Sequence, residues 1–439
     1  MSSVRHLRWS LPLLLLGLGL GLLLLKDPPG APTKVLIVLD TVRADHLSVC
    51  GYERPTSPVL EGLVAAGAEL SCEAVSPGSW TLPSHASYFT GLMPVEHGAH
   101  CITSGAKDLS GSGARARPLS EEPPTLAERL EAQGYQAHLV SSNPVVSADM
   151  GLARGFRSSH VSERWGQHFG DQLKPLIRRT LGELDPDEGP LFLVVNLADA
   201  HQPWRSVPKG LDHAEAARPL SYSKVSESGD WRRYVEGRMG EREAELLRAR
   251  ARDLYDHAVH TADANLGEVI AALEEGGWCE QGCEIVITSD HGEFLGEHGL
   301  LDHGHYVWDE NVRVPLVTLG IEGSLPEGPV SALEAHDLIL LGQPTGRQVR
   351  SEAWPHIRRC ARTEGKAYCD TAVALWGEAG KTVWRNGEQW LEVDGARTPL
   401  TEASGELEAL GLAAKADERD DGRIDEDVLR LLRAAGYVD

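Results

Sequence analysis

The stretch KVLIVLD, Lys34–Asp40, is an almost wholly apolar run that ends in an acid. Apolar runs without polar alternation are typical of strands in a parallel sheet, because such sheets are buried on both faces. Two later runs repeat this pattern: PLFLVVNL at residues 190–197 and EIVITS at residues 284–289. The alternation of such strands with helices predicts an open α/β sheet with helices on both faces. The helices are expected at residues 57–66, 125–134 and 255–273.

Acids and histidines follow the predicted strands at their carboxyl ends. They are Asp40, Asp199, His201, Asp290 and His291. In open α/β sheets the ligand site lies beyond these strand ends, so we expect the five side chains to converge although they are far apart in the sequence. Carboxylates beside histidines suit a divalent metal ion. A single acid of this kind is usually a cap or a salt-bridge partner, so the metal prediction depends on the whole group.

A hydroxyl residue lies at the predicted start of another helix, within SWTLPSHASYFTG, residues 79–91. Thr81 can cap this helix, and Pro83 falls in the first turn, where proline is tolerated. The amino end of a helix attracts anions. Alone, Thr81 predicts only a cap, but a divalent cation beside it would lower the pKa of its hydroxyl and make it a candidate nucleophile. Candidate acids, bases or further ligands are His201, His303 and His305.

Residues 1–26 have the pattern of an export signal or a membrane anchor. Arg5 and Arg8 precede an apolar run from Leu11 to Leu25. No small-x-small cleavage site follows and prolines crowd the linker at residues 27–33, which favours an uncleaved anchor over a cleaved signal peptide. The positive flank would stay in the cytoplasm. We therefore expect the membrane as a partner, with the catalytic domain exported to the periplasm or the cell exterior.

The composition bounds the partners and the redox environment. The formal net charge is −23, from 65 acidic and 42 basic residues. Proteins that bind nucleic acid carry a basic face, so we expect no nucleic-acid partner. The seven cysteines fit an exported protein. Two pairs are close enough in sequence to bridge: Cys279 with Cys283, and Cys360 with Cys369. The three others, of which two could pair, are Cys50, Cys72 and Cys101.

The character of the sequence changes after residue 323. We expect a catalytic domain over residues 34–323, with a charged insertion over the sheet face at residues 206–250. We expect a small α+β subdomain over residues 324–400, because residues 382–393 alternate like antiparallel strands around the hairpin signal Asn386-Gly387.

The last part of the chain, residues 401–439, is predicted to be an acidic tail. Residues 402–421 are acidic and rich in alanine, and we expect them to be mobile. A closing helix is expected over residues 426–435.

Several motifs, in this order and spacing, resemble the sulfatase family of the alkaline phosphatase superfamily. They are LDTVRAD at 39–45, WTLPSHAS at 80–87, TSDHGE at 288–293, GEHGL at 296–300 and RVPL at 313–316. The resemblance implies a three-layer α/β/α sandwich with a mostly parallel sheet, and metal-dependent hydrolysis of small anionic esters of sulfate or phosphate. The metal ligands that it implies are Asp40, Thr81, Asp290 and His291. The family resemblance implies calcium, and His291 leaves zinc or manganese open.

The chain departs from the family at positions that matter for its chemistry. Sulfatases of the family carry Cys-x-Pro-Ser-Arg, with the cysteine oxidised to formylglycine. Here Thr81 takes the place of that cysteine and His85 that of the arginine. Thr41 stands where a second aspartate is usual, and His303 where a lysine is expected. The family segment that holds the sulfate group is replaced by SSNP at residues 141–144.

A threonine nucleophile resembles the phosphodiesterase-like and phosphomutase branches of the superfamily. In those branches an aspartate and two histidines hold a second metal ion. The candidates here are Asp199 and His201 with His303 or His305. The catalytic residues that the resemblance implies are Thr81, His85, His201 and His303.

Three functions remain open from the sequence. The first is hydrolysis of phosphate monoesters or diesters, or transfer of a phospho-headgroup, through Thr81. The second is a sulfatase with an unusual nucleophile. The third is an inactive, membrane-anchored binding protein. Thr41 leaves one metal ligand of the family missing, but the presence of Asp40, Thr81, Asp290 and His291 argues against this third function, because an inactive site is under no constraint to keep its ligands.

Overall fold

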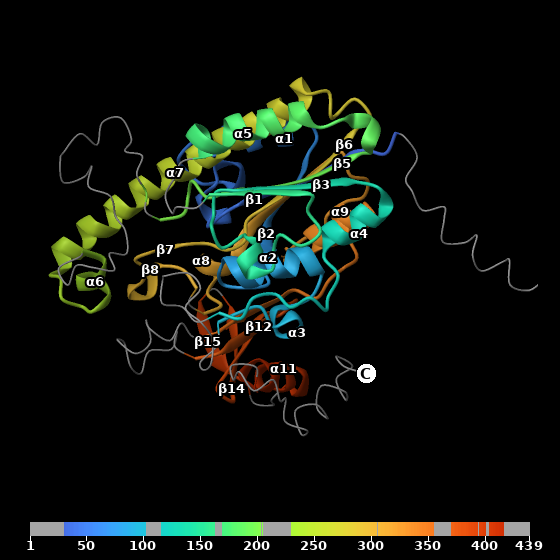
Figure 1. Ribbon diagram of the computed structural model, residues 1–439. Coiled ribbons are helices and arrows are strands. Elements are labelled where there is room, and N and C mark those ends of the chain that lie inside the picture. The colour runs from blue at the N-terminus through green and yellow to red at the C-terminus, as the bar shows by residue number, and fades with distance from the viewer. Residues whose placement is uncertain are drawn as a thin grey trace, which may run out of the picture.

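The computed structural model describes residues 30–101, 116–162, 169–202, 204, 230–304, 306–354, 370–393, 395–400 and 404–416. Its centre is an eight-stranded sheet in the order β10-β2-β9-β6-β1-β5-β3-β4 (Figure 1). Central β1 (Thr33–Leu39) pairs in parallel with β5 (Leu191–Leu197) and β6 (Cys283–Thr288), whereas β9 (Arg313–Leu319) runs antiparallel to β6. The other strands are β2 (Glu69–Val75), β3 (Gln136–Ser141), β4 (Ser158–Val161) and β10 (Val330–Ser331). The predicted mostly parallel sheet is confirmed.

Helices cover both faces of this sheet (Figure 1). One face carries α1 (Pro58–Ala65), α5 (Phe169–Glu183) and α7 (Glu241–Glu275). The other carries α2 (Thr81–Thr90), α4 (Leu126–Gln133) and α9 (Glu334–Leu341). The side chains of β1 alternate between the two cores, with Ile37 and Leu39 in the first and Leu36 and Val38 in the second. This alternation explains why the whole strand is apolar.

A separate antiparallel sheet follows the main domain. Its strands, in spatial order, are β11 (Arg350–Ala353), β12 (Ala372–Gly377), β13 (Gly380–Arg385), β14 (Glu388–Val393) and β15 (Ala396–Pro399). The predicted hairpin joins β13 to β14, and both residues of its turn, Asn386 and Gly387, have positive φ angles of 51° and 85°. Positive φ at both central positions is what a two-residue hairpin turn requires.

The predicted mobility of residues 402–421 is wrong over α11 (Gly405–Ala416), which packs on this second sheet. Leu407, Leu410 and Ala414 are buried in one cluster with Trp384 of β13. A side chain at Gly411 would collide with the Trp384 ring, because its Cβ would lie 2.0 Å from a ring atom. The spacing of these apolar residues gives the helix one buried face. The acidic composition of the segment, averaged over all its residues, did not indicate this face.

The predicted helices are also present, with one change of extent. The helix predicted at residues 255–273 begins earlier, at Glu241 of α7. Residues 241–250 are therefore helical, as expected for the end of the charged segment at residues 206–250, and they belong to the same helix as residues 255–273. Helix α4 begins with the predicted capping box, in which the hydroxyl of Thr125 accepts from the Glu128 N–H and the Glu128 carboxylate accepts from the Thr125 N–H.

The shorter helices and strands are α3 (Pro94–His97), α6 (Asp230–Val235), α8 (Asp309–Val312), β7 (Phe294–Leu295) and β8 (Leu301–Asp302). The 3-10 turns are η1 (Ala44–His46), η2 (Ser48–Cys50), η3 (Ala148–Met150), η4 (Pro186–Glu188) and η5 (Glu297–Gly299).

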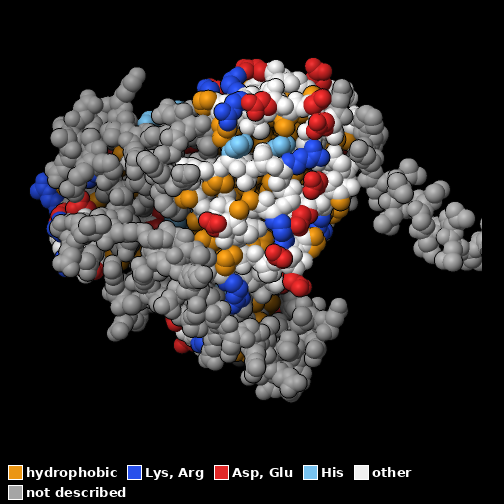
Figure 2. Space-filling model, in the orientation of Figure 1, with side chains coloured by type: hydrophobic (Ala, Val, Ile, Leu, Met, Phe, Trp, Pro, Cys, Tyr) orange, Lys and Arg blue, Asp and Glu red, His pale blue; other side chains and the backbone are white. Residues whose placement is uncertain are grey.

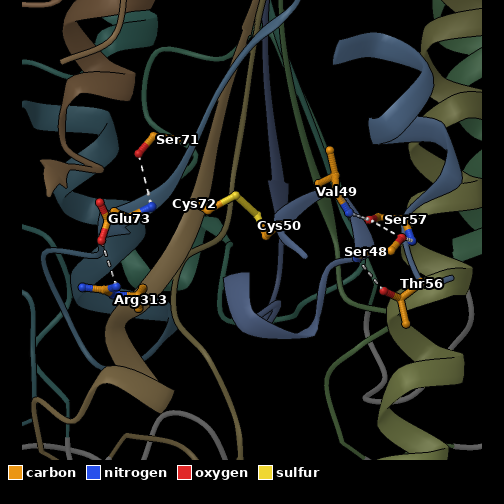
Figure 3. The surroundings of a disulfide bond; sticks show 9 residues. All are labelled: Ser48, Val49, Cys50, Thr56, Ser57, Ser71, Cys72, Glu73 and Arg313. Atoms are coloured by element: carbon orange, nitrogen blue, oxygen red, sulfur yellow. Dashed lines mark hydrogen bonds and ion pairs between the residues drawn. A yellow bond between two sulfur atoms is a disulfide. The ribbon is translucent and has the colours of Figure 1, made fainter. Parts of the chain in front are cut away.

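Two disulfide bonds are present in the described part of the chain. Cys279 pairs with Cys283, as predicted, and Cys50 pairs with Cys72, which ties the turn η2 to β2 (Figure 3). The predicted bridge between Cys360 and Cys369 lies outside the described residues, as do the apolar run from Leu11 to Leu25 and the closing helix expected over residues 426–435. Across the residues that are described, no helix is long and apolar enough to cross a membrane.

Candidate metal and nucleophile site

The carboxyl ends of β1 and β6 bring three candidate metal ligands together. Asp40 follows β1, and Asp290 and His291 follow β6. Since β1 and β6 are paired neighbours, ligand atoms of all three residues lie within 4.8 Å of one another, and all three side chains are buried. Thr81 is the first residue of α2, where the helix start meets these strand ends. The convergence expected from the strand-end acids therefore occurs for these residues.

The ring of His291 has a defined orientation. Its Nδ1 lies 2.9 Å from the carbonyl oxygen of Gly292, so Nδ1 carries the proton that is donated there. Its Nε2 lies 3.4 Å from Oγ1 of Thr81 and 3.3 Å from Oδ2 of Asp290. Burial opposes a charge on this ring, but the carboxylates of Asp290 and Asp40 raise the pKa of His291 to about 9. A cation bound at Nε2 would compete with that proton.

The carboxylate of Asp290 has one satisfied and one open oxygen. Its Oδ1 accepts from the backbone N–H groups of Thr41 and His291 at 3.1 and 3.0 Å. Its Oδ2 has no hydrogen-bond donor among the described residues. Burial favours the neutral acid, but the histidines at positions 291 and 85 lower the pKa of Asp290 well below its usual range. The group is therefore an ionised carboxylate with one oxygen open to a cation.

The carboxylate of Asp40 repeats this arrangement. Its Oδ2 accepts from Nδ2 of Asn143 at 2.6 Å and from Nδ2 of Asn196 at 3.2 Å. Its Oδ1 is buried and has no hydrogen-bond donor in the described part of the chain. An acceptor that is buried without a donor costs about 1–3 kcal/mol, and more when it is charged. The two open oxygens and Nε2 of His291 thus form a donor set that fits a divalent metal ion.

Two asparagines at this site were not predicted from the sequence. Asn143 follows β3 and donates to both Asp40 and Thr81, with a distance of 3.2 Å to Oγ1 of Thr81. Asn196 lies in β5, between β1 and β3 in the sheet, and donates to Asp40. The position of Asn143 directly after an apolar strand was the available signal. Asn196 gave no such signal, because it lies within the strand.

His85 lies beside one of the metal ligands, with its Nδ1 3.6 Å from Oδ2 of Asp290. Its side chain is fully buried on α2, one turn after Thr81. Its Nδ1 lies 3.0 Å from the carbonyl oxygen of Thr81, to which it donates, and its Nε2 accepts from Nδ2 of Asn196 at 3.2 Å. Both ring nitrogens are thus engaged within the protein. This arrangement suits a residue that supports Thr81 and Asn196 better than one that exchanges protons with a substrate.

A second group of ligands adjoins the first. Ligand atoms of Glu293, Asp302 and His303 lie within 4.8 Å of one another. The ring of His303 lies 4.4 Å from the ring of His291 and 4.8 Å from that of His201, between ring centres. The sequence prediction for this region named His201 and His303 but missed Glu293 and Asp302. Of the other two candidates, Asp199 is not part of the metal-compatible group found among the described residues, and His305 lies outside them.

One face of the molecule carries charged side chains of both signs. Figure 2 shows acidic and basic side chains interspersed on one face, with no basic patch on the described part of that face.

Comparisons with known proteins connect this geometry to a family. The family model described as Sulfatase matches residues 32–338. The protein named uncharacterized sulfatase YidJ, from Escherichia coli strain K12, is 23% identical over 265 residues, or 56% of this chain and 44% of that protein. The chain therefore spans less than half the length of this relative.

Solved structures share the fold at low identity. The phosphonate monoester hydrolase of Agrobacterium radiobacter has a TM-score of 0.57 and 19% identity, and the match covers 81% of this chain and 88% of that one. BT1596, a 2-O GAG sulfatase, has a TM-score of 0.54 and 16% identity, over 92% of this chain and 90% of that one. One neighbour is thus named for a phosphonate ester and the other for a sulfate ester, on the same architecture.

Proposed function

Since this chain belongs to the sulfatase family, we propose that it is a metal-dependent hydrolase of small anionic esters whose nucleophile is Thr81. The observation that carries the proposal is the position of the Thr81 hydroxyl, at the start of α2 and 3.4 Å from Nε2 of His291. Phosphate monoesters or diesters are the proposed substrates. Transfer of a phospho-headgroup would follow the same path, with an acceptor alcohol in place of water.

The metal site of this proposal consists of Asp40, Asp290, His291 and Thr81. A divalent cation there would lower the pKa of the threonine hydroxyl and neutralise charge on the substrate. Family resemblance favours calcium, while a nitrogen ligand from His291 suits zinc or manganese. Asn143 would keep Oγ1 of Thr81 in place, since its amide donates to that oxygen and to Asp40.

The choice of phosphate over sulfate rests on the single hydroxyl of threonine. A formylglycine hydrate has two hydroxyls, of which one attacks sulfur and the other lets the sulfated intermediate collapse. A sulfated Thr81 has no second hydroxyl that could expel the sulfate group. A phosphorylated Thr81 can be released by water that attacks phosphorus in line. The alternative, a sulfatase with an unusual nucleophile, is favoured by family membership and requires water to attack sulfur directly.

The proposed reaction has two displacements at phosphorus. Oγ1 of Thr81 bonds to phosphorus while the bond from phosphorus to the ester oxygen breaks. The proton from Thr81 is accepted by His201 and given to the leaving ester oxygen. His303 is the alternative acceptor only where the second group of ligands holds no ion. Burial and the neighbouring His303 lower the pKa of His201, so its ring is neutral near pH 7 and can accept a proton. Water then attacks phosphorus, the bond from phosphorus to Oγ1 breaks, and a proton from the water restores the hydroxyl of Thr81. The product is phosphate from a monoester and a phosphomonoester from a diester.

The second group of ligands would hold a second ion. Nδ1 of His303 lies 3.3 Å from Oε2 of Glu293 and 3.4 Å from Oδ1 of Asp302. Ligand atoms of a tetrahedral zinc site with bonds of about 2.0–2.1 Å are about 3.3–3.4 Å apart, so the spacing fits. Elemental analysis should then find two ions per chain in the purified protein and one after Glu293→Gln. One ion per chain in the unaltered protein would show that this group holds none.

We also propose that the catalytic domain is exported and held at the membrane by the run from Leu11 to Leu25. The two disulfide bonds support export, because such bonds persist in oxidising compartments. Membrane fractionation with protease protection tests this proposal. A protein recovered entirely in the cytoplasm would rule it out, and a soluble exported form beginning near Thr33 would indicate cleavage.

The role of Thr81 is tested by two substitutions. Thr81→Ala removes the nucleophile and should lower kcat on the order of 10³-fold or more. Thr81→Ser keeps a hydroxyl and should retain much more of the rate. Coexpression with a formylglycine-generating enzyme should change nothing, because the chain has no Cys-x-Pro-x-Arg. If both variants keep full activity, another group is the nucleophile.

A further inference from the structure

Thr41 has a backbone conformation that its side chain disfavours. Its φ angle is +63°, in the left-handed region that β-branched residues rarely adopt. Conformations of this kind persist only where the surrounding structure enforces them. Thr41 lies directly after Asp40, and its N–H donates to Oδ1 of Asp290 at 3.1 Å. The unusual conformation thus lies in the turn after Asp40, and this turn is hydrogen-bonded to the second candidate metal carboxylate, that of Asp290.

Side chains from distant elements hold the backbone of this turn. Ser289 Oγ accepts from the N–H of Val42 at 3.0 Å. On the other side, the hydroxyl of Tyr255 donates to the carbonyl oxygen of Thr41 at 2.6 Å and accepts from the N–H of Arg43 at 2.9 Å. Tyr255 therefore clamps the two peptide groups that follow Thr41, and its single hydroxyl uses both its donor and its acceptor capacity.

The ring of Tyr255 is itself fixed in place. It is fully buried on α7 and packs edge-on against the rings of His46 and Trp204, with centres 5.1 and 5.7 Å away. Nδ1 of His46 is in turn held 2.7 Å from the carboxylate of Asp256, the next residue of α7. A hydroxyl on a packed ring that cannot turn away is suited to hold a strained turn.

We propose that Tyr255 is a positioning residue of the metal site. Its hydroxyl keeps Thr41 in the left-handed conformation, so that the Thr41 N–H points at Asp290 and orients that carboxylate toward the cation. Without the hydroxyl, Thr41 can relax to negative φ, and its N–H leaves Oδ1 of Asp290. This inference rests on the proposed metal site, which the experiment below tests separately.

The test compares the affinity of the full chain for Mn²⁺ before and after Tyr255→Phe, by equilibrium dialysis and calorimetry. We expect the dissociation constant to rise on the order of tenfold, because the loss of the hydroxyl leaves two buried backbone groups unsatisfied and releases the turn. Tyr135→Phe is the matched control, since Tyr135 is also buried and its hydroxyl donates to the carbonyl oxygen of Pro32, before the start of β1, and not to the turn. If the Tyr255 and Tyr135 variants bind Mn²⁺ within about twofold of each other, the proposal is wrong.

A second background separates positioning from general destabilisation. Thr41→Gly removes the strain, because glycine adopts positive φ at no steric cost. Tyr255→Phe should then weaken Mn²⁺ binding far less in the Thr41→Gly background than in the original chain. If Tyr255→Phe alone does not fold, the doubly substituted chain should still fold and bind. Equal losses in both backgrounds would show that Tyr255 acts only through packing. If the unaltered protein binds no Mn²⁺, Ca²⁺ or Zn²⁺, the metal site itself is wrong.

Discussion

Oγ1 of Thr81 lies 3.4 Å from Nε2 of His291, while the other ring nitrogen, Nδ1, donates to the carbonyl oxygen of Gly292. The two residues come from different elements, the start of α2 and the end of β6. A hydroxyl and an imidazole nitrogen at this separation can bind one ion, because ligand atoms of a tetrahedral zinc site are about 3.3–3.4 Å apart. The contact therefore joins the candidate nucleophile to the candidate metal site.

The first prediction concerns the Asp290 carboxylate. Asp290→Asn should abolish metal binding and turnover together, because it removes the buried charge whose Oδ2 faces the site. Metal content by elemental analysis and kcat on a phosphoester measure the two effects. Asp263→Asn is the control, since Asp263 is also buried but bonds the backbone at the start of α1. An Asp290→Asn protein with full metal content and turnover would show that the site is misassigned.

The second prediction concerns Asn143. Asn143→Ala should lower kcat by about 10–100-fold with a smaller change in KM, because the lost amide orients Asp40 and the Thr81 hydroxyl rather than the substrate. Steady-state kinetics of the metal-loaded enzyme measure this split. Asn311→Ala is a useful comparison, since Asn311 is equally buried and donates to backbone carbonyls. A change confined to KM would assign Asn143 to substrate binding instead.

The third prediction is a pH dependence of stability from His336. Burial lowers the pKa of His336 to about 4, from 6.5. Between these values the unfolded chain binds a proton that the folded chain does not, so the contribution is complete above pH 6.5 and is lost as the pH falls toward 4. Between pH 7 and pH 5 the unaltered protein should lose about 2 kcal/mol more free energy of unfolding than His336→Gln. Urea titrations at both pH values measure the difference, and parallel losses would refute it.

The fourth prediction compares the two disulfide bonds. The bond from Cys50 to Cys72 closes a sequence separation of 22, and the bond from Cys279 to Cys283 a separation of 4 (Figure 3 shows the first). Loop-closure entropy gives about 3 kcal/mol for the first and about 2 kcal/mol for the second. We would replace each cysteine pair by serine and measure the free energy of unfolding in urea. The loss should be larger without the bond from Cys50 to Cys72 than without the bond from Cys279 to Cys283. A larger loss for the short loop would show that entropy does not decide these contributions.

The sequence predicted those parts of the site that are local in the chain. Asp40 and Asp290 could be placed because each comes directly after an apolar strand, and Thr81 because it begins a helix. Asn196 could not be placed, because its role depends on the register in which β5 lies between β1 and β3, opposite Val38 and Ser141. That register is set by long-range pairing and has no signature within β5 itself.

The helix α11 was missed for a different reason. Its acidic, alanine-rich composition is typical of solvated segments, and composition averages over the faces of a helix. Only the packing of Leu407 and Leu410 against Trp384 shows that one face is buried. The partner of Cys50 was also open, since three cysteines remained after the local pairs were assigned.

The most direct test of the account is a comparison of kcat/KM on matched aryl esters. The purified protein, supplied in turn with Ca²⁺, Mn²⁺ and Zn²⁺, is assayed with p-nitrophenyl phosphate, bis(p-nitrophenyl) phosphate and p-nitrophenyl sulfate, beside the Thr81→Ala variant. We expect at least one phosphoester to have a higher kcat/KM than the sulfate, and Thr81→Ala to abolish this activity. A higher kcat/KM for the sulfate than for both phosphoesters would contradict the account and leave a sulfatase with a threonine nucleophile.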